Sequence, residues 1–385
     1  MNRPRILFYV QHLVGIGHFK RAAAISRAAA ARGMGVTLVS GGQAPTEIDL
    51  GAAKLMQLPA VHATEDDYAT LLVEDGSQAD DVLRRRRAGL VLEEFERCQP
   101  DVLVVELFPF GRRQMKFELL PLLRAARDAR PRPVIVSSIR DILVGQSRAG
   151  RADEVCGHLD TYFDHVLVHA DPSLVTLGAT FPQENRIKKM VTYTGYVADR
   201  IAEENGEDGT NEVVVSAGGG AVGRRLLEVA STCRPLTALH DHIWRLLVGS
   251  RGSAGSLASR LGRKDSGVIV EAARSDFPAL LSRAAVSVSQ GGYNTIVEIL
   301  RAKTPAVVVP FATGVETEQT IRAELLRKRR LIEVVPEGEL SPESLAKAVD
   351  SAYRAGPGDA DIDLSGANAT ADLLEAWARQ GARNA

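Results

Sequence analysis

Residues 286–298 read Val-Ser-Val-Ser-Gln-Gly-Gly-Tyr-Asn-Thr-Ile-Val-Glu, and this stretch decides the fold class. A short run rich in valine ends in two glycines, and a helical pattern follows at once. Strands that alternate with helices in this way form βαβ units and a parallel sheet. The same alternation runs through the whole chain, so we predict an α/β protein.

Further strands are predicted wherever a short apolar run lies between turn residues. In the first half of the chain these runs are residues 6–10, 36–40, 102–106, 134–138, 166–169 and 191–194. In the second half they are residues 212–216, 243–248, 268–270, 286–288, 306–309 and 331–335. Helical patterns lie between them, so each half resembles a parallel sheet covered by helices.

The segment from Glu203 to Gly209 is acidic, contains glycine and has no apolar residue, which makes it the best linker candidate. A chain of 385 residues is too long for one ordinary core, and the strand–helix pattern restarts after this segment. We therefore predict two Rossmann-like domains, residues 1–200 and 211–365, with parallel sheets facing across a cleft. A C-terminal helix, residues 366–385, is expected to cross back to the first domain.

Composition and charge disfavour several classes of function. The formal net charge is -1, so no general positive field attracts nucleic acid or an anionic membrane. Four arginines at 84–87 have acidic neighbours, which indicates a solvated helix face. Cys98, Cys156 and Cys233 are far apart and fit a reducing cytoplasm better than a disulfide or zinc framework. No apolar run has the length of a membrane span, so we expect a cytoplasmic protein.

A glycine-rich loop, Gly15-Ile16-Gly17-His18, lies between the first predicted strand and its helix. Glycines allow close approach of the backbone to a ligand, and a helix N-terminus offers free N–H groups. His18 titrates near neutral pH and is a candidate general base. The alternative is a tight turn with a capping-type histidine. Lys20 stands where the dinucleotide fingerprint needs a third glycine, which disfavours a nicotinamide enzyme.

Two loops in the second half carry a similar pattern. Residues 217–223, Ala-Gly-Gly-Gly-Ala-Val-Gly, suit a diphosphate that meets the backbone at a helix start, and they lack the Lys-Ser/Thr ending of a P-loop. Gly291-Gly292 repeats the arrangement, and Glu298 follows one turn later, where a carboxylate could bind a ribose diol. Spacing alone favours a capping box formed by Thr295 and Glu298.

Polar residues also follow strands in the first half. Glu106 ends one predicted strand, and Arg140-Asp141 follows the next, at the sheet edge where open α/β sheets bind ligands. An Arg-Asp pair is more often a structural ion pair. The stretch from Leu107 to Phe117 mixes apolar and basic residues, which fits either contact with a bilayer surface or a loop packed in the first domain; we favour the packed loop.

From Gln290 to Gln319 the sequence resembles the donor-binding signature of GT-B glycosyltransferases. The shared features are the glycine turn, the Asn/Thr pair, the helix glutamate, a strand between prolines at 305–310 and an acidic-Gln pair. The resemblance is closest to the MurG-like branch, glycosyltransferase family 28. The Gly-His loop also fits this layout, and the stretch at 109–113 resembles predicted bacterial glycosyltransferases.

The resemblance implies a role for each matching residue. Glu298 would bind the ribose, Glu318 and Gln319 would read the donor sugar, and the glycine loops would face the diphosphate. The implied donor-binding set is Gly218, Gly219, Gly220, Arg251, Gly291, Gly292, Asn294, Thr295, Glu298, Glu318 and Gln319. His18 matches the family's first-domain histidine, and Glu106 and Asp141 join it as catalytic candidates because of their place at the sheet edge. Gly15, Gly17 and Arg140 are the candidates on the acceptor side.

The implied reaction moves a hexose from a UDP-linked donor, such as UDP-N-acetylglucosamine, to a nucleophile of a small-molecule or lipid-linked acceptor. Inversion is expected, and backbone N–H groups would stabilise the leaving diphosphate without a metal or other cofactor. A lipid-linked acceptor would bring the protein to the inner face of the membrane. The alternatives are a UDP-sugar hydrolase, which the loop at 15–18 followed by Arg21 also resembles, and a UDP-sugar 2-epimerase. A donor-binding subunit without activity is disfavoured because both halves of the fold are present.

Overall fold

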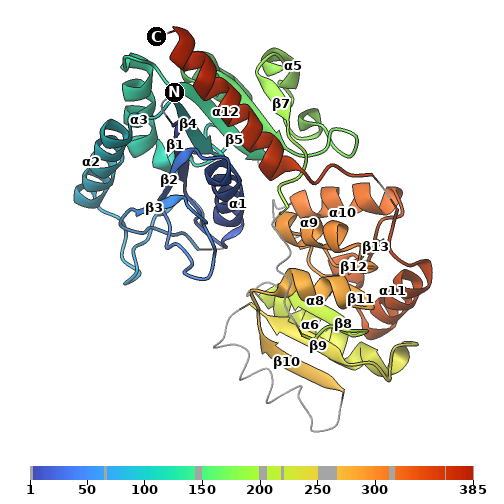
Figure 1. The fold of residues 1–385 in the computed structure, drawn as a ribbon. Coiled ribbons are helices and arrows are strands. Elements are labelled where there is room, and N and C mark those ends of the chain that lie inside the picture. Colours follow the sequence, from blue (N-terminus) through green and yellow to red (C-terminus); the bar gives the residue numbers. More distant parts are fainter. Residues whose placement is uncertain are drawn as a thin grey trace. The chain divides into compact units, whose positions relative to one another are not determined.

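The protein folds into two compact units (Figure 1). The structure, a computed structural model, describes residues 3–64, 67–143, 150–198, 206–217, 221–249, 267–311, 317–359 and 361–384. The first unit is Met1–Asp199 with Asp363–Ala385, and the second unit is Arg200–Ile362. Each unit has its own parallel sheet with helices, so the predicted α/β fold class is confirmed.

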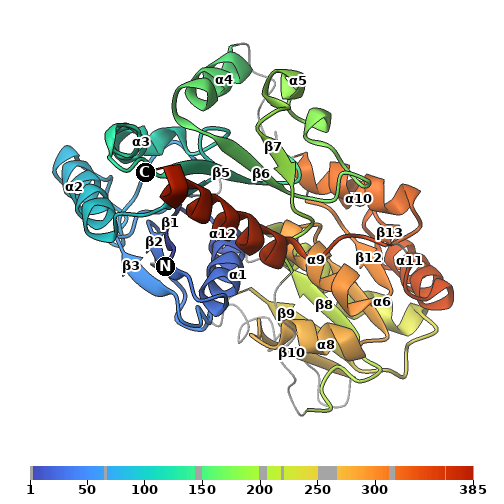
Figure 2. The ribbon, with the colours of Figure 1, turned by 45° about the horizontal axis from the view of Figure 1, so that its top comes forward.

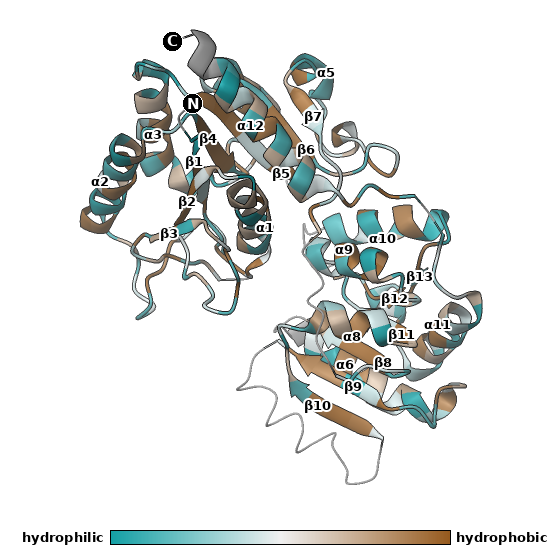
Figure 3. Ribbon diagram, in the orientation of Figure 1, coloured by the Kyte–Doolittle hydropathy of each residue, from teal (hydrophilic) through white to brown (hydrophobic). Residues whose placement is uncertain are grey.

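A parallel sheet in the order β3-β2-β1-β4-β5-β6-β7 forms the centre of the first unit. Its strands are β1 (Arg5–Val10), β2 (Gly35–Ser40), β3 (Lys54–Gln57), β4 (Val102–Glu106), β5 (Val134–Arg140), β6 (His165–His169) and β7 (Val191–Tyr193). The central strands are apolar and buried because helices cover the sheet (Figure 3). The strand order reverses between β1 and β4, which is the topological switch point where such sheets bind ligands.

Among the residues that the structure describes, six helices accompany this sheet. They are α1 (Gly17–Ala31), α2 (Asp81–Cys98), α3 (Lys116–Asp128), α4 (Arg151–Tyr162), α5 (Glu184–Ile187) and α12 (Gly366–Asn384). Although α12 ends the chain, it runs beside α1 (Figures 1 and 2), because small alanines on α1 let the two helices approach closely. Trp377 of α12 also stacks on His165, with ring centroids 4.1 Å apart.

The second unit has a six-stranded parallel sheet in the order β10-β9-β8-β11-β12-β13. Its strands are β8 (Val213–Ala217), β9 (Trp244–Val248), β10 (Val268–Ala272), β11 (Val286–Ser289), β12 (Ala306–Val308) and β13 (Glu333–Val334). Its helices are α6 (Ala221–Cys233), α8 (Phe277–Arg283), α9 (Tyr293–Ala302), α10 (Glu318–Lys328) and α11 (Pro342–Ala355). Here the order reverses between β8 and β11, so the two predicted glycine loops follow the two strands of the switch point.

Short 3₁₀ turns complete the secondary structure. They lie at Arg113–Met115, Leu177–Ala179, Arg234–Leu236 and Glu337–Glu339. Every predicted strand is present, and one observed strand, β3, was missed. The reason is its exposure at the sheet edge: Leu55 is 45% exposed, so β3 lacks the apolar run that marks a buried strand.

The prediction of a solvated face for the arginines at 84–87 is wrong for one of them. Arg87 of α2 is fully buried, and its guanidinium donates to Glu118 of α3 (2.7 and 2.9 Å) and to the carbonyl oxygen of Gly41 (2.9 Å). The other three arginines are exposed. A run of four residues extends beyond one full turn of helix, so one side chain must face inward.

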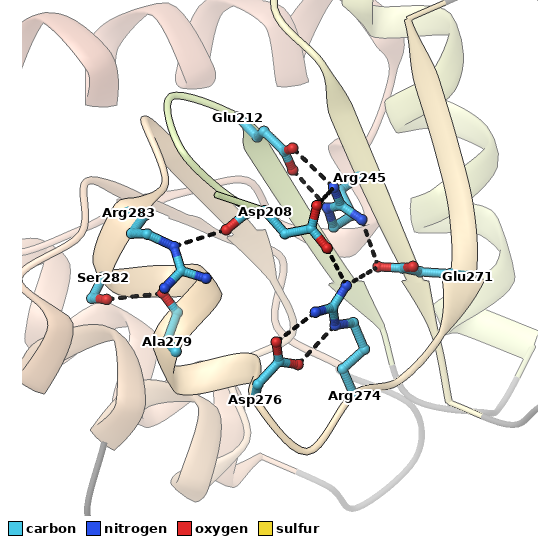
Figure 4. A network of polar contacts seen from close by, with 9 residues as sticks. All are labelled: Asp208, Glu212, Arg245, Glu271, Arg274, Asp276, Ala279, Ser282 and Arg283. Carbon is cyan, nitrogen blue, oxygen red and sulfur yellow. Dashed lines mark hydrogen bonds and ion pairs between the residues drawn. The ribbon is translucent and has the colours of Figure 1, made fainter. Parts of the chain in front are cut away.

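An ion-pair network secures the start of the second unit (Figure 4). Arg245 of β9 is 5% exposed and donates to Glu212 (2.6 Å), Glu271 (2.9 Å) and Asp208 (3.1 Å). Arg274 also contacts Asp208, at 2.7 Å. Each arginine is therefore matched by carboxylates, and the network ties the acidic segment before β8 to the sheet.

Candidate active site

The first part of the site lies at the switch point of the first unit, where the loop after β1 adjoins the end of β4. Gly15 adopts φ +65°, a conformation that favours glycine, and α1 then begins at Gly17. The N-cap residue is Ile16, whose side chain makes no capping bond. The interpretation of His18 as a capping-type residue is therefore wrong, because His18 lies inside the first turn of α1.

His18, Glu106 and Arg21 form a compact polar cluster at this point. His18 Nδ1 lies 2.9 Å from Glu106 Oε1, and Arg21 Nη2 donates to the same carboxylate oxygen. Glu106 is fully buried, whereas 13% of the His18 side chain is exposed. Burial, aided by the charges of Arg112 and Arg21, lowers the pKa of His18 to about 3. Burial raises the pKa of Glu106, but Arg21 and the bond from His18 outweigh it and hold that pKa below its usual value.

These contacts determine which nitrogen of His18 carries the proton. Glu106 is ionised and can only accept, whereas Arg21 Nη2, which lies 3.1 Å from the same Nδ1, can only donate. Because Arg21 Nη2 already donates to Glu106 Oε1, we assign the proton of a neutral His18 to Nδ1. The lone pair of Nε2 is then available to accept a proton from a substrate. A neutral imidazole held in this way has the form that a general base requires.

Behind Glu106 lies a buried chain of hydrogen bonds that sequence reasoning missed. Ser138 Oγ donates to Glu106 Oε2 (2.5 Å) and lies 2.9 Å from His169 Nε2. His169 Nδ1 lies 2.8 Å from Thr194 Oγ1. Because the Ser138 hydroxyl points its proton at the carboxylate, a neutral His169 donates to Ser138 from Nε2. The Thr194 hydroxyl lies between His169 Nδ1 and the carbonyl oxygen of Gly195, to which it donates (3.0 Å). Burial, with the charge of Arg21, lowers the pKa of His169 to about 3, so this chain is neutral beyond Glu106.

Asp141 contacts residues other than His18 and Glu106. Its carboxylate accepts from the backbone N–H of Ile142 (2.9 Å) and from the hydroxyl of Tyr196 (3.4 Å). Arg140 ends β5, and its charge acts on Arg112, which follows β4. Glu106 is therefore the catalytic candidate that contacts His18.

The second part of the site lies at the switch point of the second unit, in the loop after β11. Gly291 donates its N–H to Gln319 Oε1 (2.9 Å), and its carbonyl oxygen accepts from Arg322 Nη1 (2.7 Å). Gln319 Oε1 also accepts from the N–H of Phe311 (3.1 Å), after β12. A Cβ on Gly291 would lie 3.2 Å from Val308 and 3.3 Å from Gln319. Helix α10 thus holds the glycine loop at both backbone polar groups of Gly291.

This arrangement corrects one interpretation and adds one residue. The N-cap of α9 is Gly292, without a side-chain cap, and Thr295 is the third helical residue, so the capping box of Thr295 with Glu298 is wrong. Within the described residues, the side chains of Asn294 and Thr295 make no hydrogen bond, and both are half-buried. Arg322, which sequence reasoning missed, also lies 3.5 Å from Glu318, so Glu318 belongs to the support of the loop.

Several predicted donor residues cannot be placed. Gly218, Gly219, Gly220 and Arg251 lie outside the described residues. The roles of Glu298 in ribose binding and of Glu318 and Gln319 in sugar binding stay predictions.

Two further features bear on the predicted function, namely metal-binding clusters and segments that could meet a membrane. In the described part of the chain, no group of three or more His, Cys, Asp or Glu side chains could hold a metal ion. The interpretation of residues 107–117 as a packed loop is confirmed, because Phe108, Phe110 and Met115 are at most 1% exposed. Across the described ranges, no helix is both long and apolar enough to cross a bilayer.

The sequence is similar to those of known glycosyltransferases. Residues 213–360 match the glycosyltransferase family 28 C-terminal domain. An uncharacterized glycosyltransferase of Methanopyrus kandleri is 28% identical over 145 residues, which are 38% of this chain and 39% of that protein. The UDP-N-acetylglucosamine–N-acetylmuramyl-(pentapeptide) pyrophosphoryl-undecaprenol N-acetylglucosamine transferase of Geobacillus kaustophilus is 27% identical over 195 residues, which are 48% of this chain and 54% of that protein.

Solved structures extend the likeness to the whole fold. The glycotransferase of kitacinnamycin is 19% identical, with a TM-score of 0.62 over 98% of this chain and 100% of that one. At this identity the likeness shows the fold, which is GT-B. The matches to the two curated relatives span only 39% and 54% of their lengths.

Proposed function

We propose, from the premise that this GT-B chain is MurG-like and carries a glycosyltransferase family 28 C-terminal domain, that it transfers a hexose from a nucleotide sugar to an acceptor nucleophile. The observation that carries the proposal is the glycine loop after β11, which lies inside the matching residues 213–360 and is held at a switch point by α10. The donor is UDP-linked, with UDP-N-acetylglucosamine as the first candidate, because the relative from Geobacillus kaustophilus is named for that donor.

In this proposal the second unit binds the donor. The first N–H groups of α9 and the side chains of Asn294 and Thr295 contact the diphosphate, and Glu298 binds the ribose. A helix N-terminus attracts anions, and its aligned N–H groups stabilise the charge that develops on the leaving diphosphate. The transfer proceeds without a metal ion.

The first unit supplies the base. Nε2 of His18 removes the proton from the acceptor nucleophile as it attacks the anomeric carbon, which inverts the configuration there. Glu106 stabilises the imidazolium that forms and keeps Nδ1 protonated, at a distance of 2.9 Å. Both curated relatives are named as transferases, and the neutral histidine with its ionised partner supports this assignment.

A nucleotide panel tests the donor side. The unfolding temperature is measured with UDP, GDP, dTDP and their sugars, because a ligand that binds the folded state raises it. We expect UDP and UDP-N-acetylglucosamine to give the largest shift, and EDTA to leave the shift and the turnover intact. If none of these nucleotides changes the unfolding temperature, the proposal is wrong.

The same samples separate transfer from its alternatives. UDP release without any acceptor, at the full rate, identifies a hydrolase, and a change of configuration at C2 of the free sugar identifies a 2-epimerase. UDP release that depends on an added acceptor supports the transferase.

A further inference from the structure

The segment after β4, residues 107–112, forms a tight turn that ends at Arg112. Leu107 and Arg112 adopt φ +66° and +60°, in the left-handed region that residues other than glycine rarely occupy. The N–H of Gly111 donates to the carbonyl oxygen of Leu107 (2.8 Å) and closes the turn, while Phe108 and Phe110 are buried as anchors. Such backbone conformations persist where surrounding structure enforces them, and they gather at functional sites.

Arg112 differs from the other inward-facing arginines in its partners. Its Nε donates to the carbonyl oxygen of Gln11 (2.6 Å), after β1. No carboxylate among the described residues lies within ion-pair distance of it. Arg112 is half-buried, whereas the four buried arginines of the described chain each have a carboxylate partner: Arg21 with Glu106, Arg87 with Glu118, Arg245 with Glu212 and Arg322 with Glu318.

The charge of a second arginine, Arg140, acts on Arg112. Burial and the charge of Arg140 lower the pKa of Arg112 to about 10, which leaves it charged at neutral pH. Glu106, the nearby carboxylate, already accepts from Arg21, His18 and Ser138. A charge removed from water without a counter-charge destabilises the folded state, so a bound anion would relieve this cost.

A second polar group near Arg112 lacks a partner. His12 is 7% exposed, and its Nε2 lies 3.0 Å from the carbonyl oxygen of Gln43, so the proton belongs on Nε2. Within the part of the chain that the structure describes, its Nδ1 has no hydrogen-bond partner. This unpaired lone pair lies close enough to Arg112 for the arginine's charge to lower the pKa of His12, which burial lowers first.

We infer that Arg112 binds an anionic oxygen group, a phosphate or a carboxylate, of the acceptor at the carboxyl edge of the first unit's sheet. That the anion belongs to the acceptor rests on the proposed function, whereas the existence of an anion site at Arg112 does not. The guanidinium presents a planar fork of N–H donors. Its Nε is bound to Gln11, and within the described residues its terminal nitrogens make no hydrogen bond, so they are left for a ligand. His18, whose pKa Arg112 also lowers, lies close enough to act on a nucleophile of the same molecule.

The test measures anion binding with UDP present at saturation, so that a diphosphate-binding loop in the second unit is already occupied. Inorganic pyrophosphate and malonate are the probes, and their separate responses distinguish phosphate from carboxylate. The proteins are the full-length wild type, Arg112→Gln, Arg112→Lys and the control Arg113→Gln. Arg113 is the adjacent arginine, it is 41% exposed and pairs with Glu154, so its substitution makes the same change in net charge.

We expect at least one probe to raise the unfolding temperature of the wild type and of Arg113→Gln. Arg112→Gln should bind that probe about tenfold more weakly or worse, as expected for loss of a charged hydrogen bond, and Arg112→Lys should be intermediate. Without anion, Arg112→Gln should unfold no earlier than wild type, because it removes a charge that has no counter-charge.

The inference is overturned if Arg112→Gln keeps the full anion response, if neither probe stabilises the wild type, or if Arg112→Gln unfolds well below wild type without anion. UDP binding is recorded in the same samples. Intact UDP binding with an anion response that does not depend on Arg112 rejects this inference alone, whereas absent UDP binding rejects the proposed function.

Discussion

At the scale of single residues, the chemistry depends on how His18 is held. A free imidazole in water is partly protonated near neutral pH and can carry its proton on either nitrogen. In this protein burial keeps His18 neutral, and ionised Glu106 places the proton on Nδ1. The two effects act on different properties of His18. Burial keeps its imidazole neutral, and the carboxylate of Glu106 keeps the proton of that neutral imidazole on Nδ1.

His18→Ala should lower kcat about 10²–10⁴-fold, the usual contribution of a positioned base. The dissociation constant of the donor nucleotide should change little, because the donor belongs to the second unit in our proposal. Both constants are measured on one purified preparation, with His62→Gln, an exposed histidine of the first unit, as the control. An unchanged kcat in His18→Ala would remove His18 from the mechanism and leave it a role in packing.

Glu298→Ala should raise the KM for the donor about 10–100-fold, as expected when a charged hydrogen bond to the ribose is lost. The effect should be one of binding, because Gly292 is the N-cap of α9 and the helix does not use Glu298 in a capping box. Glu298→Gln, which keeps an acceptor oxygen without the charge, should fall between the two. A variant that binds UDP like the wild type and unfolds earlier would show that Glu298 is structural.

At the scale of elements, the contact of α10 with the glycine loop is the feature that links packing to binding. The loop backbone is held at its N–H by Gln319 and at its carbonyl oxygen by Arg322, from the first and second turns of α10. The N–H groups of α9 can be aimed at a ligand before it binds only if this turn is rigid. Preorganised donors of this kind need no rearrangement when charge develops on the leaving group.

Gln319→Leu should therefore weaken UDP and UDP-N-acetylglucosamine to the same degree, about tenfold, and lower the unfolding temperature. The N–H groups of Gly291 and Phe311 would lose their acceptor, and an unsatisfied buried donor costs about 1–3 kcal/mol. Gln319→Glu keeps the acceptor oxygen and should retain the stability. If Gln319 instead reads the sugar, as the family resemblance implies, only the affinity for the sugar nucleotide will fall while UDP binds normally. Isothermal titration calorimetry with UDP and with UDP-N-acetylglucosamine distinguishes these two roles of Gln319.

The elements and the loops of this site could be predicted from the sequence, but its supporting contacts could not. Buried strands and glycine turns are local signals, and they led to the loops at 15–18 and 290–292. The partners of those loops are distant in the chain: Glu106 is 88 residues from His18, and Arg322 is 31 residues from Gly291. A local pattern cannot show such a pairing.

One signal could have found more of the site. Glu106 was chosen because it ends a predicted strand, β4, and His169 ends β6, two strands along the same sheet, in the same way. Ser138 ends a predicted run as well. The rule that polar residues at the carboxyl ends of parallel strands meet would have placed these residues together. The capping box failed for a different reason, since the glycine pair allowed α9 to begin before Thr295.

At the scale of the whole molecule, the buried histidines make stability depend on pH. His18 and His169 have pKa values of about 3 in the folded protein, against about 6.5 for an unfolded histidine. As pH falls below 6.5, these histidines bind protons in the unfolded chain but not in the folded first unit. The free energy of unfolding therefore falls. The depressed pKa of Glu106 acts in the same direction at lower pH, because its ionised form is favoured by folding.

The first unit should therefore lose about 2 kcal/mol of stability per buried histidine between pH 7 and pH 5, since the unfolded chain binds protons over about 1.5 pH units of that interval. The chain has two tryptophans, Trp244 in the second unit and Trp377 in the first, so Trp244→Phe leaves a single fluorescent reporter of the first unit. Urea unfolding of this background is measured at both pH values. Adding His169→Gln should remove about 2 kcal/mol of the pH dependence, because it eliminates one neutral buried imidazole. His12, His158 and His165, whose pKa values burial also lowers, keep their contributions. A slope that His169→Gln does not alter would mean that this histidine takes up its proton equally in the folded and unfolded chain, contrary to its burial between Ser138 and Thr194.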